Sequence, residues 1–112
     1  MDFDEYQKDA SKTAIYPKEY TLYYLTLGFC GEAGELANKV KKIIRDDKQL
    51  DLSNLTQSKK EELILELGDS LWYASQIADK LGYKFNNVAE KNLAKLDDRF
   101  RRGKIGGSGD NR

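Results

Sequence analysis

The apolar residues between positions 64 and 81 recur every three or four residues, with no proline among them. This spacing places one continuous apolar stripe along a helix, whereas a strand would alternate apolar and polar side chains. The stripe consists of Ile64, Leu67, Leu71, Ala74, Ala78 and Leu81. The rest of the chain is rich in leucine, alanine, glutamate and lysine, and Pro17 is its one proline. The sequence therefore predicts an all-α fold.

Local signals divide the chain into four expected helices, at residues 2–14, 18–45, 59–81 and from 86 or 87 to 102. The residue before a proline avoids helical angles, so the first helix ends before Pro17. Ser58 is the expected N-cap of the third helix, and Gly82 suits its end. A polar connector covers residues 46–60. One domain is expected over 1–104, followed by a glycine-rich tail at 105–112.

The second helix has an expected inner face with helical spacing. Its members are Tyr20, Tyr24, Leu27, Gly31, Gly34 and Val40. Glycine inside a helix costs up to about 1 kcal/mol relative to alanine, so its repeated use there indicates close packing or close approach of a ligand.

Two pairs of acids lie inside otherwise uncharged segments. Glu32 and Glu35 are the only charged residues from 20 to 37, and Glu66 and Asp69 the only ones from 63 to 74. Residues three apart share one face of a helix. If both pairs face the bundle interior, four carboxylates repel one another and lose solvation, unless a raised pKa or a divalent cation relieves them. An ordinary solvated face is the competing interpretation.

The absence of histidine limits the chemistry. Zinc sites usually need histidine or cysteine ligands, and this chain has no histidine and only Cys30. Ser-His-Asp and Cys-His catalysis are excluded in their usual forms. Carboxylate oxygens favour hard cations, so magnesium is the expected metal, with manganese as a substitute. A lone cysteine forms no internal disulfide, which fits the reducing cytoplasm.

The overall charge limits the classes of partner that we expect. Lys and Arg total 19 and Asp and Glu total 19, which gives a net charge of zero and argues against nucleic acid as a partner. The chain lacks an apolar stretch of about 18 residues, so no membrane partner is expected. Its acidic, polar N-terminus is unlike a secretory signal. We expect a cytoplasmic protein.

The acidic pairs stand in the segments "GEAGEL" and "ELGDSLWY", which "KNLAKLDDRFRRGK" and "GSGDNR" follow. In these segments the chain resembles the MazG-like nucleoside triphosphate pyrophosphohydrolases, from about residue 6 to its end. The resemblance implies a four-helix MazG-like bundle, assembled into a homo-oligomer as a dimer or tetramer. It also implies magnesium-dependent hydrolysis of a (deoxy)nucleoside triphosphate to the monophosphate and pyrophosphate, by a metal-activated water.

The same resemblance assigns roles to the acids. Carried over by position, Glu32, Glu35, Glu66 and Asp69 are the metal ligands of a four-carboxylate site. A carboxylate also serves as general base towards the attacking water, with Glu35 and Glu66 as the catalytic candidates.

Basic and amide side chains are candidates for binding the triphosphate. Lys39 and Lys42 continue the Glu32–Glu35 face, while Asn92, Lys95 and Arg99 share a face of the last helix. Lysine and arginine make strong charge-assisted bonds to phosphate oxygens. The MazG-like motif includes Lys39, Asn92 and Lys95. For each basic residue, a solvated surface charge is the competing interpretation.

Aromatic side chains are the candidates for recognition of the base. Trp72 and Tyr73 are candidates to contact the base, although a helical bundle also needs aromatic residues in its core. The composition of the tail favours disorder. The resemblance instead favours a segment that folds over the nucleotide or a neighbouring subunit, with Asp110 and Arg112 as contacts.

Three other functions compete with this interpretation. One is a dUTP- or dCTP-type, or phosphoribosyl-ATP, pyrophosphohydrolase of the same superfamily, which shares the metal chemistry but selects another base. A second is a non-catalytic helical interaction module whose acids are structural. A di-iron carboxylate bundle is disfavoured, because such sites use Glu-x-x-His pairs.

Overall fold

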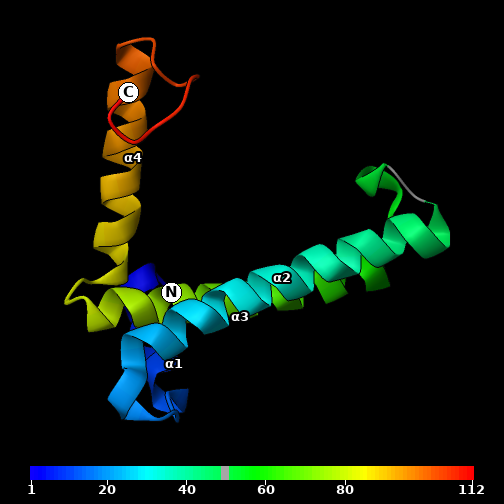
Figure 1. Ribbon diagram of the computed structural model, residues 1–112, viewed down its shortest axis with the longest axis horizontal. Coiled ribbons are helices and arrows are strands. Elements are labelled where there is room, and N and C mark those ends of the chain that lie inside the picture. The colour runs from blue at the N-terminus through cyan, green and yellow to red at the C-terminus, as the bar shows by residue number, and fades with distance from the viewer. Residues whose placement is uncertain (49–50) are drawn as a thin grey trace.

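The computed structural model describes residues 1–48 and 51–112, and every regular element within them is a helix (Figure 1). The α-helices are α1 (Phe3–Ala10), α2 (Thr21–Asp47), α3 (Gln57–Lys80) and α4 (Phe85–Arg101). Short 3-10 turns lie at Ser11–Thr13, Lys18–Tyr20 and Leu52–Asn54. The predicted all-α fold with four helices is confirmed. Gln49 and Leu50, in the expected connector, lie outside the described residues.

The helix ends differ in detail from the predictions. The N-cap of α3 is Thr56, whose side-chain oxygen accepts the N–H of Lys59 at 3.2 Å. The prediction of Ser58 is wrong, because Ser58 lies inside the first turn, beyond the position where a side chain caps. The first helix ends at Ala10 rather than 14, since the chain there tightens into a 3-10 turn. Gly82, at φ +83°, follows α3 in the left-handed region that suits glycine.

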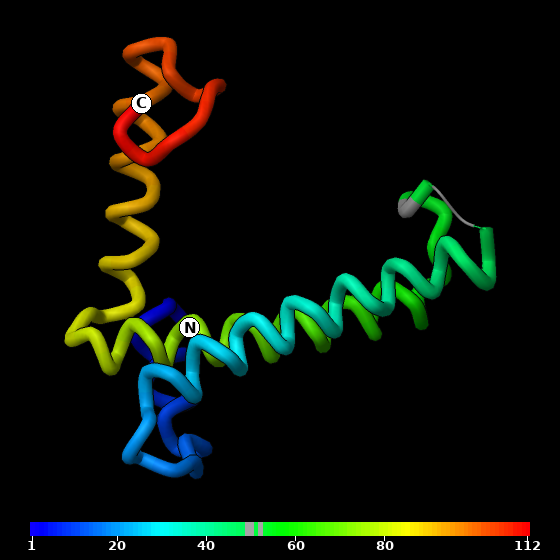
Figure 2. Tube along the Cα trace, in the orientation of Figure 1, coloured from blue at the N-terminus to red at the C-terminus, as the bar shows by residue number. Residues whose placement is uncertain are grey.

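Helices α2 and α3 form a long antiparallel hairpin, visible in Figures 1 and 2. The inner face predicted for α2 is wrong, because Tyr20 and Leu27 are 64% and 72% exposed. The buried face runs through Leu25 and Ile43 instead. Apolar residues lie on several sides of α2, so its packing against α3 decides which side is buried. The ring of Tyr73 in α3 contacts the backbone position of Gly28, where a larger residue would not fit.

The buried amide of Gln7 helps to attach the short helix α1 to the rest of the structure. The Nε2 of Gln7 donates to the carbonyl oxygens of Ser75 and Tyr83, each at 3.0 Å. Its Oε1 accepts the N–H of Phe85 at 3.1 Å. Gln7 therefore joins α1 to the end of α3, to the following turn and to the start of α4.

Helix α4 stands away from the hairpin (Figure 1). Its first turn is anchored, since Phe85 is buried with its ring 5.0 Å from that of Phe3, and the N–H of Asn86 donates to Asp4. The radius of gyration is 17.0 Å, whereas a compact chain of this length would have about 13 Å. One chain therefore does not close a four-helix bundle by itself.

The tail folds back on the last turn of α4 (Figure 2). The guanidinium of Arg99 donates to the carbonyl oxygen of Asp110 at 2.9 Å, and that of Arg102 donates to the carbonyl oxygen of Arg112 at 2.7 Å. Gly103, at φ +67°, begins this turn. The tail thus makes its contacts with its own helix.

The contact at Gly28 yields a prediction. Gly28→Ala would place a methyl group inside the ring of Tyr73 and should destabilise the fold by about 1–3 kcal/mol in urea unfolding. Gly34→Ala is the matched control, because nothing lies near the added methyl, and should stabilise α2 by about 0.5–1 kcal/mol. Equal effects of the two substitutions would contradict the packing described here.

Candidate metal and nucleotide site

Three of the predicted acids converge where α2 faces α3. Glu32 comes from α2, and Glu66 and Asp69 come from one face of α3. One carboxylate oxygen from each lies within 4.8 Å of the others. Glu32 and Glu66 are half-buried, while Asp69 is exposed. The antiparallel pairing thus brings together acids that are far apart in the sequence.

The fourth acid, Glu35, lies beside this group and outside it. It is exposed, and its charge acts on both Glu32 and Lys39. The structure therefore brings three of the four predicted ligands within reach of one ion and leaves Glu35 next to them.

The cluster has more negative than positive charge. Burial, and then the charges of the neighbouring acids, raise the pKa of Glu32 above its usual range. The Nζ of Lys39 lies 2.8 Å from Oε1 of Glu66, and this contact raises the pKa of Lys39. One lysine offsets one acid, so Glu32 and Asp69 retain an unbalanced charge that suits a divalent cation.

Tyrosines border the acids on the side towards α1. Burial, and then the neighbouring Tyr24 and the charges of Glu32 and Asp69, raise the pKa of Tyr73. Burial and the charge of Asp69 raise the pKa of Tyr6 in the same way. Tyr24, Gly28 and Glu32 follow one another at four-residue spacing on α2.

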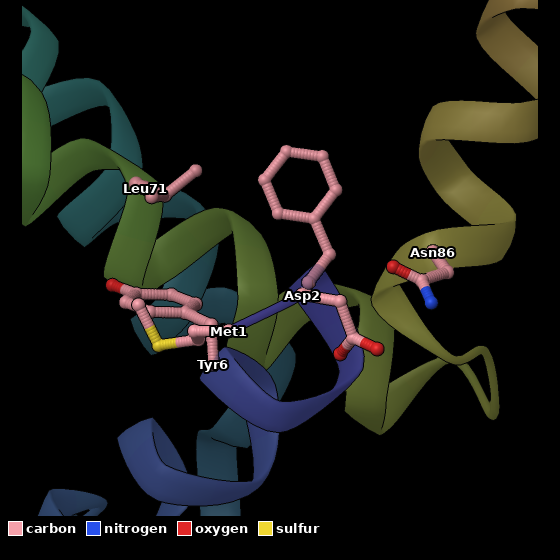
Figure 3. Close-up of a pocket in the computed structure, with 6 residues that line it drawn as sticks. Met1, Asp2, Tyr6, Leu71 and Asn86 are labelled. Atoms are coloured by element: carbon pink, nitrogen blue, oxygen red, sulfur yellow. The ribbon is translucent and has the colours of Figure 1, made fainter.

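The sequence analysis placed Tyr24 on the inner face of the second helix without a role at the site, and it did not single out Tyr6. For Tyr24, the four-residue spacing before Glu32 was an available signal. Tyr6 belongs to another helix and had none. The ring of Tyr24 stacks on that of Tyr16, 5.2 Å away and nearly parallel. Tyr6 and Leu71 border a hollow of about 400 Å³ that reaches Asn86 at the start of α4. Figure 3 shows how these side chains lie.

Trp72 has a structural contact. Its Nε1 donates to the carbonyl oxygen of Ala10 at 3.1 Å and to Oγ1 of Thr13 at 2.9 Å. Its ring also meets that of Tyr73 edge-on, with 5.0 Å between centroids. Trp72 therefore fastens α1 to α3 and supports Tyr73 from behind.

The basic candidates are divided between two places. Lys39 and Lys42 line one hollow of about 260 Å³ between α2 and α3, which continues along the hairpin from the acids. Asn92 and Lys95 line a shallow hollow on α4 with Tyr83 and other neighbours. Arg99 is only 5% exposed beneath the tail. The chain thus brings Lys39 to the acids and leaves Asn92, Lys95 and Arg99 on the separate helix.

A comparison with known protein families identifies the domain. Residues 21–102 match the model of the MazG nucleotide pyrophosphohydrolase domain. The matched segment contains the whole hairpin with its three converging acids, and α4. The chain belongs to this family.

A relative is known from a bacteriophage. The chain is 48% identical to the Gene 37 protein of Mycobacterium phage L5, over an alignment of 118 residues that covers all of both chains. No solved structure matches the chain. Among the helices of residues 1–48 and 51–112, none has both the length and the apolar character needed to cross a membrane.

The raised pKa of Glu32 yields a prediction. An acid whose pKa is raised by folding opposes folding once it is ionised. Glu32→Gln should therefore raise the melting temperature of the metal-free protein at pH 7, and this gain should vanish below the ordinary glutamate pKa of 4.5. Melting curves in a chelator from pH 4 to pH 8 measure it. Glu61→Gln, on α3 outside the cluster, is the control, and an equal gain in this variant would contradict the assignment.

Proposed function

We propose that the protein hydrolyses a (deoxy)nucleoside triphosphate to the monophosphate and pyrophosphate, with magnesium as the cofactor and manganese as a substitute. The observation that carries this proposal is the convergence of Glu32, Glu66 and Asp69 within the segment that matches the MazG domain. Membership of the family makes a pyrophosphohydrolase the expected kind of enzyme. The nucleotide and the metal are the parts proposed here.

The acidic cluster fits magnesium by its chemistry. Its donors are carboxylate oxygens within 4.8 Å of one another, and burial, followed by the charges of the neighbouring acids, raises the pKa of Glu32. Such a set of hard oxygen donors suits magnesium. Glu32, Glu66 and Asp69 would hold the ion, with Glu35 at the edge. When bound, magnesium screens the phosphate oxygens and acidifies the attacking water.

The chain's own residues would accept the proton of the water, bind the phosphates and contact the nucleoside. Glu35 is exposed beside the cluster and is placed to accept the proton of a water, while Glu66 shares this role only if Lys39 releases it. Lys39 and Lys42 lie on the same side of the hairpin and would bind phosphate oxygens. Tyr73, pressed against Gly28, would form a fixed wall for the nucleoside.

The setting of the reaction is part of the proposal. A cytoplasmic location fits the exposed free thiol of Cys30, which would be oxidised more readily in an oxidising compartment.

Selection of dUTP, dCTP or phosphoribosyl-ATP would alter the substrate and leave the acids in the same roles. A purely structural role of the acids would leave the protein without activity.

A nucleotide panel tests the proposal. Purified protein is incubated with each common nucleoside triphosphate, with and without magnesium, and pyrophosphate release is measured. Glu66→Gln and Asp69→Asn should each lower the rate about 10²-fold or more while retaining the helical fold. Glu61→Gln should keep the wild-type rate. Activity that survives in either cluster variant, or that does not require a divalent cation, would refute the site.

A further inference from the structure

The ion pair between Lys39 and Glu66 lies within the acidic cluster of Glu32, Glu66 and Asp69. The Nζ of Lys39 is 2.8 Å from Oε1 of Glu66, and the two side chains are 34% and 15% exposed. Glu66 is also one of the three acids whose oxygens lie within 4.8 Å of one another. The same carboxylate is therefore the partner of a lysine and a proposed ligand of magnesium.

A lysine and a magnesium ion compete for a half-buried carboxylate. Magnesium binds carboxylate oxygens directly, so an ion held by Glu66 would lie within a few ångströms of the ammonium group of Lys39. Two positive charges at that separation repel each other, and little water is present around Glu66 to screen the repulsion. Binding of the metal therefore requires Lys39 to turn away from Glu66, and the loss of the ion pair weakens metal binding.

A hollow beside the cluster offers Lys39 another position. Lys39 lines the hollow of about 260 Å³ between α2 and α3, together with Lys42 and Lys59. The charge of Glu62, which lines the same hollow, also acts on Lys39. Lysine side chains make strong charge-assisted bonds to phosphate oxygens. Phosphates placed in this hollow would therefore hold the ammonium group away from Glu66.

The other two lysines of the hollow have no such double position. Lys59 lies about two helical turns before Glu66 on α3, and its charge acts on Asp46. Within the described part of the chain, neither Lys42 nor Lys59 forms an ion pair with an acid of the cluster, whereas Lys39 does. Lys39 is therefore the lysine through which a metal ion and a phosphate can affect each other's binding.

We propose that Lys39 is an internal counter-ion that competes with magnesium for Glu66, and that the phosphates of the substrate remove this competition by binding the lysine. Metal and triphosphate then bind cooperatively, and the site takes up the two together in preference to the bare ion. The second half of this inference rests on the proposed function, which supplies the triphosphate. The competition between Lys39 and the metal needs no nucleotide.

Metal binding to the nucleotide-free protein tests the competition without any assay of activity. Manganese, the expected substitute for magnesium, is the probe, because the electron paramagnetic resonance signal of the free ion is lost on binding. Lys39→Met removes the ammonium group and keeps a long side chain that suits a helix. This variant should bind manganese about tenfold more tightly than the wild type, because the metal no longer displaces a charge-assisted contact.

Lys59→Met is the matched control, because it removes the same charge from the same hollow without a contact to the cluster. Its affinity for manganese should stay close to that of the wild type. Lys39→Gln is a second uncharged variant, which replaces Lys39→Met if circular dichroism shows that the latter is unfolded. Equal gains in the Lys39 and Lys59 variants would indicate a general effect of charge and would overturn the proposal, as would an unchanged affinity in the Lys39 variant.

Thermal melting tests the cooperativity. Inorganic tripolyphosphate is the probe, because it carries the phosphates without a base. Each protein is melted alone, with magnesium, with tripolyphosphate and with both. In the wild type the two together should raise the melting temperature by more than the sum of their separate effects, and this excess should be smaller in Lys39→Met. Magnesium also binds tripolyphosphate in solution, but to the same extent for both proteins, so an equal excess in the two would refute the coupling through Lys39.

Failure of the proposed function gives a different pattern from failure of this inference. If the wild type releases no pyrophosphate from any nucleotide while Lys39→Met binds manganese more tightly than Lys59→Met, the proposed function fails and the competition is supported. If neither the wild type nor a Lys39 variant binds manganese, the competition is refuted, whether or not the protein is active. If tripolyphosphate stabilises none of the proteins, the cooperativity is refuted.

Discussion

The contact between the ring of Tyr73 and Gly28 fixes how α2 and α3 lie against each other. A residue without a side chain leaves room for the ring, and Gly28 meets it in the register that the structure shows. That register places Glu32 opposite Glu66 and Asp69. A slip of one helical turn would move the acids by about 5.4 Å, more than the 4.8 Å within which they now lie. The geometry of the site is therefore a consequence of helix packing.

Repulsion between like charges makes the acidic cluster unfavourable for folding, and contacts elsewhere in the structure offset this cost. Like charges oppose one another at Glu32, and Lys39 offsets only Glu66. Packing on the far side compensates, since Trp72 fastens α3 to α1 through its indole N–H. Stability built outside the site thus allows an unbalanced charge within it, which is the usual relation between a functional site and its scaffold.

Local patterns in the sequence were enough to predict the helices and the acids, because helical spacing and turn residues act over a few positions. They were not enough to choose the buried face of α2, where Leu25 rather than Leu27 is inside. That choice depends on Tyr73, which is 45 or more residues away in the chain. The same reason explains why Glu35 lies outside the cluster and why Tyr6 was missed. The direction of α4 likewise depends on contacts with α1, and no local pattern reveals it.

The amide of Gln7 orients the last helix. Through its bonds to Ser75, Tyr83 and Phe85, it determines the direction in which α4 leaves the end of α3. Gln7 lies outside the matched segment of residues 21–102. Family members that differ in their first residues would therefore hold the last helix at other angles. A short N-terminal segment would in this way set the angle of the last helix, while the hairpin and its acids stay the same.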